Sequence, residues 1–211
     1  MMCTGASRRA FTYVETRPAV PSHLRRTGPL LRSVVARASD DNGDRIDYAA
    51  LWQAHIDTEF TEKSADAAVA TMVEHATVNH IPTLMGGAGR ELLREFYARH
   101  FIPKMPNDVV IKPINRTIAP EAHRVMDEFL FEMLPGVAPT GKRVSVPFVV
   151  VVDFEGTKLK AERIYWDQAT VLKQLGLLPE GLPVAGAEQS LKAADPAAVP
   201  SNGMLRAVGA V

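Results

Sequence analysis

The chain has 211 residues, enough for one domain with a substantial core, and its formal net charge at pH 7 is zero. This balance gives no global field that would attract nucleic acid or an anionic membrane, and no apolar run is long enough to span a bilayer. Cys3 is the only cysteine, which excludes an intramolecular disulfide and a cysteine-based metal cluster. We therefore expect neither nucleic acid nor a membrane as a partner.

Residues 1–39 differ in composition from the rest of the chain. They contain seven arginines, no lysine and one acidic residue, Glu15, and so carry a net charge of +6. An arginine-rich, serine-containing, acid-poor segment is typical of an organelle transit peptide, but a disordered basic extension has the same composition. Residues 40–44 reverse the charge and mark a boundary, so residues 1–44 are interpreted as an extension. As a transit peptide it would imply a plastid or mitochondrion; otherwise we expect a cytoplasmic protein.

Three helices are predicted in the first half of the domain. Apolar residues recur at helical spacing from Tyr48 to Phe60, and Asp47 is available as the N-cap. A second helix is predicted after Ser64, with an apolar stripe that reaches Ala76. A third is predicted from Arg90 to Phe101.

Two segments between these helices are predicted to be non-helical. Residues 77–82 are expected to be extended, because Pro82 disfavours helical geometry in the residue before it. Residues 86–89, Gly-Gly-Ala-Gly, predict a flexible loop. This loop lacks the lysine and serine or threonine of a phosphate-binding loop, so nucleotide binding is not expected.

The second half of the domain reads as a sheet. Four strands are predicted, over residues 109–118, 123–134, 143–154 and 158–166. Their succession without intervening helices predicts an antiparallel sheet, and residues 155–157 suit a hairpin turn. A helix from Gln168 to Leu175 follows, with Gly176 as its stop signal. The fold class is therefore α+β, with the domain over residues 45–178.

Residues 179–211 are rich in alanine, proline and glycine and contain no aromatic residue. Such a segment buries little apolar surface, so we expect a mostly disordered tail. A short helix near residues 188–194 is its only predicted element.

Asp167 lies where the last strand ends, and its position supports two interpretations. It can be the N-cap of the helix that follows. On a strand, however, Arg163, Tyr165 and Asp167 share one face, whereas Ile164 and Trp166 share the other. If the Tyr165 face is concave, the Asp167 carboxylate points into an aromatic-lined cavity. Desolvation there would raise its pKa and suit it to remove a proton from a carbon acid.

Other ionisable residues are candidates as well. His80 could polarise a carbonyl group or relay a proton, or be a hydrogen-bonded structural histidine. Asp127 and Glu128 lie on a strand with two largely apolar faces, so at least one of them lines a pocket or is paired. A structural ion pair with Arg116 or Arg163 is the favoured interpretation. No His-x-x-x-His or Glu-x-x-His pair suggests a metal site.

Three stretches resemble the SnoaL-like, polyketide-cyclase-related branch of the NTF2-like superfamily. They read VNHIPTLMGGAGRELLREFYARHFIPKMP, LPGVAPTGKRVSVPFVVVVDF and ERIYWDQATVLKQLGLL. The resemblance covers residues 48–178, and its most distinctive part is the final Trp-Asp followed by Gln-Leu-Gly. It implies a cone of three N-terminal helices packed on a curved antiparallel sheet, with a short C-terminal helix.

The resemblance also implies a mechanism. Cyclases of this branch close a polyketide ring by aldol condensation without a metal or cofactor, using an acidic residue near the last strand and a histidine. Carried over, Asp167 is the acid–base residue and His80 its helper, with Glu128 as a second acid, and the cavity interpretation of Asp167 becomes the favoured one. The expected substrate-binding residues are Trp52, Phe96, Tyr97, Tyr165, Trp166 and Arg163.

Two functions follow as hypotheses. The first is a cofactor-independent general acid–base enzyme for a small hydrophobic carbonyl compound, with cyclase, isomerase or dehydratase chemistry. The second is a non-catalytic module that binds a small ligand or dimerises. We expect a homodimer, because this fold often pairs through the convex face of its sheet. An apolar strip suited to core or interface is formed by Val144, Val146, Phe148, Val150 and Val152.

Overall fold

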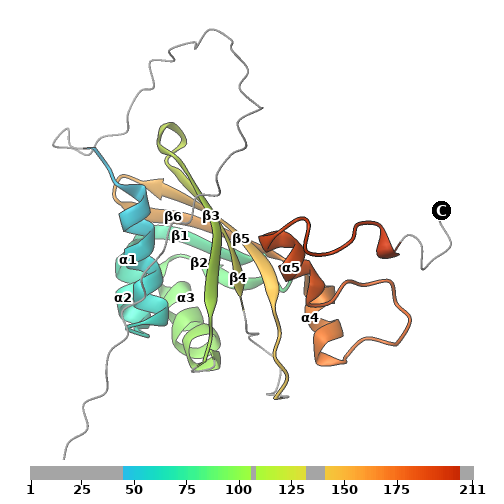
Figure 1. Cartoon of the computed structure of the whole chain (residues 1–211). Coiled ribbons are helices and arrows are strands. Elements are labelled where there is room, and N and C mark those ends of the chain that lie inside the picture. Colours follow the sequence, from blue (N-terminus) through green and yellow to red (C-terminus); the bar gives the residue numbers. More distant parts are fainter. Residues whose placement is uncertain (1–44, 106–107, 132–140, 205–211) are drawn as a thin grey trace, which may run out of the picture.

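The computed structural model of the chain describes residues 45–105, 108–131 and 141–204. The extension of residues 1–44 lies outside the described residues, as does the end of the strand predicted to reach Leu134. In the described part of the chain, no helix is long and apolar enough to cross a membrane. The described elements form an α+β domain (Figure 1).

Two capped helices open the domain. Helix α1 (Tyr48–Phe60) begins at Asp47, whose side chain accepts a hydrogen bond from the backbone N–H of Ala50. Helix α2 (Ala65–Ala70) is capped by Ser64. The predicted second helix is therefore confirmed only as far as Ala70, and the apolar stripe beyond it belongs to a strand. Alternating burial in that strand places Met72, Ala76 and Val78 in the core, so apolar spacing alone misplaced the end of the helix.

The third predicted helix is present but changes its hydrogen-bond pattern along its length. Helix α3 (Arg90–Glu95) continues into a π-helical turn (Phe96–Phe101) and then a 3₁₀ turn (Ile102–Lys104). The π-helical turn buries Phe96, Tyr97 and Phe101 together. The wider turn thus presents three aromatic side chains to the core.

The glycine-rich segment is a strand, not the predicted loop. Strand β2 (Met85–Ala88) pairs antiparallel with β1 (Met72–His80), with Gly86 opposite Asn79. Gly86 has φ +132°, and a Cβ atom at this position would lie 2.0 Å from the carbonyl oxygen of Val78. Only glycine allows the two strands to approach so closely.

The sheet has six strands and is mixed, whereas four antiparallel strands are predicted. Its other members are β3 (Ile111–Ala119), β4 (Arg124–Phe131), β5 (Val146–Glu155) and β6 (Lys158–Trp166). The strand order is β2-β1-β6-β5-β4-β3. The pair β1–β6 is parallel and the other pairs are antiparallel. Strands β3 to β6 follow one another as antiparallel neighbours, and the last of them, β6, then lies beside β1.

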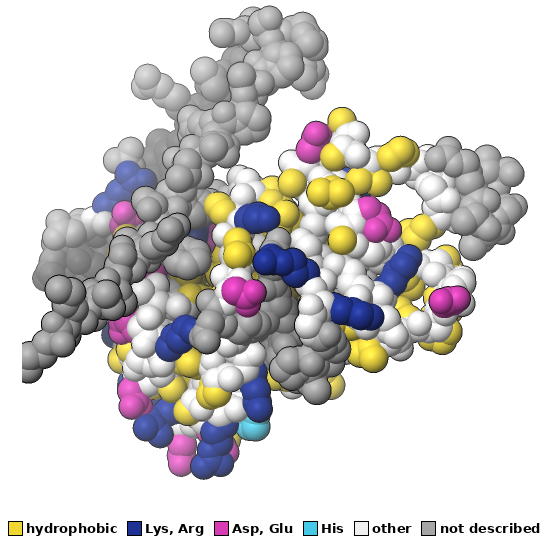
Figure 2. Space-filling view, turned by 60° about the horizontal axis from the view of Figure 1, so that its bottom comes forward, with side chains coloured by type: hydrophobic (Ala, Val, Ile, Leu, Met, Phe, Trp, Pro, Cys, Tyr) yellow, Lys and Arg dark blue, Asp and Glu magenta, His cyan; other side chains and the backbone are white. Residues whose placement is uncertain are grey.

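The core lies between the sheet and helices α1, α2 and α3, which gather on one side of it (Figure 1). The apolar strip from Val144 to Val152 is buried within this core, so its interpretation as core is confirmed and it does not form an interface. Figure 2 shows one face of the molecule, where basic and acidic side chains are interspersed among hydrophobic ones.

The segment after the sheet is tied to the domain. Helix α4 (Gln168–Leu175) ends at Gly176, as predicted, in a left-handed conformation. The tail, expected to be mostly disordered, contains helix α5 (Glu188–Ala194). The hydroxyl of Thr170 on α4 lies 2.7 Å from the carbonyl oxygen of Ala185. The described part of the tail therefore folds back onto α4.

Asp167 is the N-cap of α4 and does not line the cavity described below. Its Oδ1 accepts hydrogen bonds from the backbone N–H groups of Ala169 and Thr170, at 2.9 and 3.3 Å. Its Oδ2 accepts a hydrogen bond from Gln189 of α5, at 2.6 Å. The favoured cavity placement is thus wrong, because both oxygens are held by the two C-terminal helices.

Replacing Asp167 should test this structural role. We expect Asp167→Ala to lower the free energy of unfolding by about 1 kcal/mol, because the helix loses its cap, whereas Asp167→Asn keeps most of the stability. Urea unfolding followed by circular dichroism measures the difference. An Ala variant as stable as the wild type would show that the cap contributes nothing.

Candidate functional site

A cavity of about 100 Å³ lies between α1 and the concave face of the sheet. Seven of its lining residues carry a phenyl or indole ring: Trp52, Phe60, Phe101, Phe129, Phe131, Phe148 and Trp166. Five ionisable side chains interrupt the apolar surface: Glu59, His80, Arg116, Asp127 and Glu162. The cavity therefore suits a small apolar molecule that also needs polar groups at defined points.

Three of the aromatic side chains form a row across the sheet. Phe129, Phe148 and Trp166 are cross-strand neighbours on β4, β5 and β6. Their rings stack, with centroids 5.6 Å apart for the first pair and 5.7 Å for the second. The strand register thus builds a flat, rigid wall.

Asp127 is held by three donors at the cavity wall. Arg116 donates to both of its carboxylate oxygens, at 3.0 and 2.7 Å, and the indole N–H of Trp52 donates to Oδ2 at 2.9 Å. The predicted ion pair with Arg116 is therefore confirmed. Glu128, the candidate second acid, points to the opposite face and is exposed, so it does not line the cavity. Strand alternation allows only one of the two neighbours to face inward.

His80 lies in the cavity wall, as expected of the candidate helper. Its ring packs against Phe96 and Phe101, with centroids 5.9 and 5.8 Å apart. Burial lowers the pKa of His80 to about 4, although the negative charge of Glu59 acts in the opposite direction. The imidazole is therefore neutral at pH 7.

Trp166 brings a polar group into the aromatic row. Its indole nitrogen is buried and has no hydrogen-bond partner among the described residues. Tyr165 lies on the other face of β6 and is 43% exposed, and Arg163 on that face is bound to Asp153 at 2.7 Å. The concave face of β6 is thus the Ile164 and Trp166 face, contrary to the assumption under which Asp167 enters the cavity.

Two further predicted binding residues lie behind the cavity wall. Phe96 and Tyr97 are buried in the core and do not line the cavity. Of the six expected substrate-binding residues, Trp52 and Trp166 line it. Whether either contacts a substrate stays a prediction.

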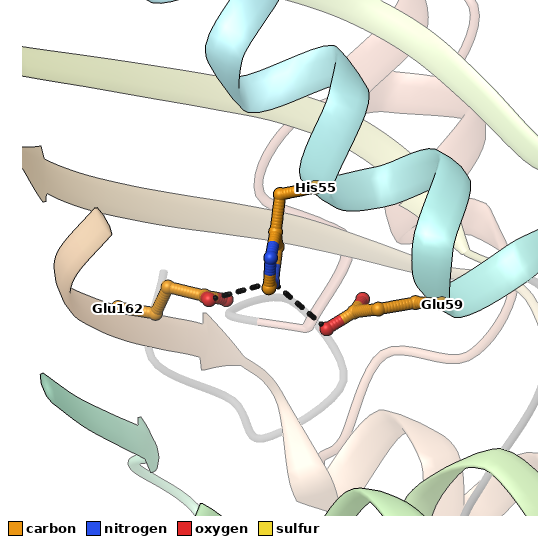
Figure 3. A group of neighbouring side chains, drawn as sticks. All are labelled: His55, Glu59 and Glu162. Carbon is orange, nitrogen blue, oxygen red and sulfur yellow. Dashed lines mark ion pairs between the residues drawn. The ribbon is translucent and has the colours of Figure 1, made fainter. Parts of the chain in front are cut away.

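A buried cluster of His55, Glu59 and Glu162 adjoins the cavity and was missed by the sequence reasoning (Figure 3). Nε2 of His55 lies 3.1 Å from a carboxylate oxygen of each glutamate. Burial alone would lower the pKa of His55, but Glu162 and Glu59 outweigh it and raise the pKa to about 10. The sequence does contain a signal for part of this cluster, because a histidine and a glutamate four residues apart, His55 and Glu59, share one face of a helix.

The buried neutral imidazole of His80 should make stability depend on pH. Its pKa is about 4 in the folded protein and 6.5 when unperturbed, so the unfolded chain binds more protons between these values. We expect stability to fall as the pH drops from 6.5 toward 4, by up to about 3 kcal/mol from this group. Urea unfolding at several pH values measures the fall, which His80→Gln should reduce. An identical pH profile in the variant would contradict the assignment.

Comparisons with known proteins give likenesses of structure only. No protein-family model matches the sequence, and no significant match was found among curated proteins. The chain is similar in structure to a protein with a ketosteroid isomerase-like fold from Catenulispora acidiphila, at 20% identity and a TM-score of 0.49, over 63% of this chain and 94% of that one. It is also similar to an NTF2-like protein of unknown function from Burkholderia pseudomallei, at 14% identity and a TM-score of 0.49, over 61% and 96% of the two chains.

A third similar structure is the epoxide hydrolase/cyclase-like enzyme SalBIII of pyran ring formation in polyether salinomycin. It shares 20% identity, with a TM-score of 0.48, over 57% of this chain and 91% of that one. At such values none of these structures assigns an activity or a ligand to this chain. The SnoaL-like branch stays a prediction.

Proposed function

We propose that the cavity binds a small, apolar carbonyl compound and transfers a proton at the carbon atom next to its carbonyl group. The observation that carries this proposal is the buried indole N–H of Trp166, which has no hydrogen-bond partner among the described residues. Its side chain lines the same cavity as the neutral imidazole of His80. The first group is a hydrogen-bond donor, and the second can take up a proton.

The indole N–H of Trp166 is the group that would bind the carbonyl oxygen. A buried donor without a partner costs about 1–3 kcal/mol, and such donors are rare in folded proteins. Because indole can only donate, its complement must be an acceptor. A carbonyl oxygen is an acceptor that an apolar molecule can carry, and its hydrogen bond strengthens as enolate charge develops on it.

His80 is the group that would accept the proton. His80 lies on β1 opposite Ile164 of β6, and Ile164 is two residues before Trp166. The side chains of His80 and Trp166 therefore line the cavity from adjacent strands. Its lone pair is available at pH 7 because the ring is neutral. Burial disfavours the protonated ring that proton transfer would create, and the negative charge of Glu59 offsets part of this effect. Enolisation of this kind is the shared first step of isomerisation, aldol cyclisation and many dehydrations.

The group of Arg116, Asp127 and Trp52 would position the substrate without acting as the base. Both oxygens of Asp127 already accept hydrogen bonds from Arg116 and Trp52, which hold the carboxylate in place. The group instead fixes one of the polar points in the cavity wall. The cavity, at about 100 Å³, is smaller than the cavity of roughly 150 Å³ that holds benzene in another protein. We therefore expect a substrate no larger than about one ring.

Exchange of hydrogen for deuterium tests the proposal without knowledge of the natural substrate. In D2O at pH 7, the protein should accelerate loss of the α-proton signals of small ketones such as cyclopentanone, measured by NMR. We expect His80→Gln to lower the rate about 100-fold or more, because a general base is typically worth 10²–10⁴. Trp166→Phe should lower it about 10-fold through one lost hydrogen bond.

Tyr165→Phe is the matched control, because Tyr165 neighbours Trp166 but faces away from the cavity. It should leave the rate unchanged. Binding of a ketone without any exchange would favour the second hypothesis, a ligand-binding module. A rate that His80→Gln does not change would remove His80 from the mechanism.

A further inference from the structure

The cluster of His55, Glu59 and Glu162 carries an inference beyond proton transfer by His80. His55 and Glu59 come from successive turns of α1, and Glu162 comes from β6 (Figure 3). Their side chains are 0%, 7% and 4% exposed. One ligand atom from each lies within 4.8 Å of the others. Three groups able to bind a metal thus converge where water is largely excluded.

The ring of His55 is oriented by a partner on its other nitrogen. Its Nδ1 lies 2.6 Å from the hydroxyl oxygen of Thr71, and that hydroxyl donates its proton to the carbonyl oxygen of Ala68 at 2.7 Å. The Thr71 oxygen therefore accepts from an N–H at Nδ1. In the neutral ring this leaves the lone pair on Nε2, aimed at the two carboxylates. A ligating histidine is held in the same way in most metal sites.

One ring nitrogen of the cluster faces both carboxylates. Nε2 of His55 lies 3.1 Å from an oxygen of Glu59 and 3.1 Å from an oxygen of Glu162. The hydroxyl of Tyr97 lies 3.4 Å from Nε2 and adds one further polar neighbour. Oε1 of Glu162 is buried, and Nε2 of His55 is its neighbour at 3.1 Å. A divalent ion at this point would be bound by all three side chains.

Two of the three distances between the ligand atoms also suit one shared ion, and the third is within 4.8 Å. Bonds of roughly 2.0–2.2 Å to nitrogen and oxygen place two ligands about 2.9–3.4 Å apart at octahedral to tetrahedral angles. Both observed separations from Nε2 are 3.1 Å. We propose that His55, Glu59 and Glu162 bind one divalent first-row transition-metal ion beside the cavity.

The ligand set indicates the class of ion and its surroundings. One imidazole and two carboxylates suit ions such as Zn²⁺ or Mn²⁺, whereas Ca²⁺ requires six or more oxygen ligands. Glu59 and Glu162 line the cavity, so a bound ion would lie at its wall. Three protein ligands with a position open to a cavity are typical of a catalytic site.

This site departs from the expectation that the chain uses no cofactor. Neither His80 nor Trp166 is a ligand, although the proposed ligand Glu59 also acts electrostatically on His80. Glu162→Gln and His80→Gln therefore separate loss of metal binding from loss of proton exchange.

Metal titration of the full, untagged chain tests the site. After treatment with a chelator and its removal, Zn²⁺ should bind with one site per chain by isothermal titration calorimetry, and Co²⁺ should give a visible absorption spectrum that Zn²⁺ abolishes. Loss of an outer-shell partner typically costs 10- to 100-fold in affinity, so Glu162→Gln, which removes a ligand, should weaken binding at least about 100-fold. Thr71→Val, which removes the partner of Nδ1, should weaken it about 10- to 100-fold.

The exposed pair of His75 and Glu155 supplies the control, since it also joins a histidine to a glutamate, at 3.5 Å. Glu155→Gln should bind Zn²⁺ like the wild type. If Glu162→Gln does not fold, Glu59→Gln replaces it, and circular dichroism without metal reports folding. Affinity no better than millimolar in the wild type, or wild-type affinity in the folded ligand variant, would overturn the proposal.

Discussion

The parallel pairing of β1 with β6 is the constraint on which the cavity depends. Its register sets Val78 beside Glu162 and His80 beside Ile164. Three groups with separate chemistry therefore share one region of the concave wall: a neutral imidazole, an indole N–H and a carboxylate. The same pairing brings Glu162 under α1, where His55 and Glu59 lie. Without it, residues from the first and last strands would have no common cavity.

Most elements of the fold could be predicted because each carries a local signal. Asp47, Ser64 and Gly176 mark helix ends by hydrogen-bonding and backbone preferences that act within a few residues. Strand β2 could not be predicted in this way. The need for glycine at Gly86 arises from a distant carbonyl group, that of Val78, so the segment resembles a loop until the sheet is assembled. The parallel pairing of β1 with β6 likewise joins segments far apart in the sequence, so no local pattern predicts it.

The sequence predicted some of the residues that line the cavity, but not which face of β6 points into it. Alternation correctly separates Ile164 and Trp166 from Tyr165, but both faces of β6 carry charged and apolar residues, so the pattern does not say which face is concave. An irregular register opposite Asp153 also shifts the phase, and Leu159 and Glu162 both point inward although they are three residues apart. If the Tyr165 face of β6 were concave, Asp167 would be the acid of β6 near the cavity; because the Ile164 face is concave, it is Glu162.

The two edges of the sheet have a consequence for how this protein meets other chains. Strand β2 is only four residues long and has an unusual backbone at Gly86. At the far edge, β3 contains Pro113, which has no N–H to donate, and its register shifts between Pro113 and Asn115. Neither edge offers a long, regular row of free backbone groups, which is what an added strand needs. Strand addition and edge-to-edge aggregation are therefore disfavoured at both edges of the described sheet.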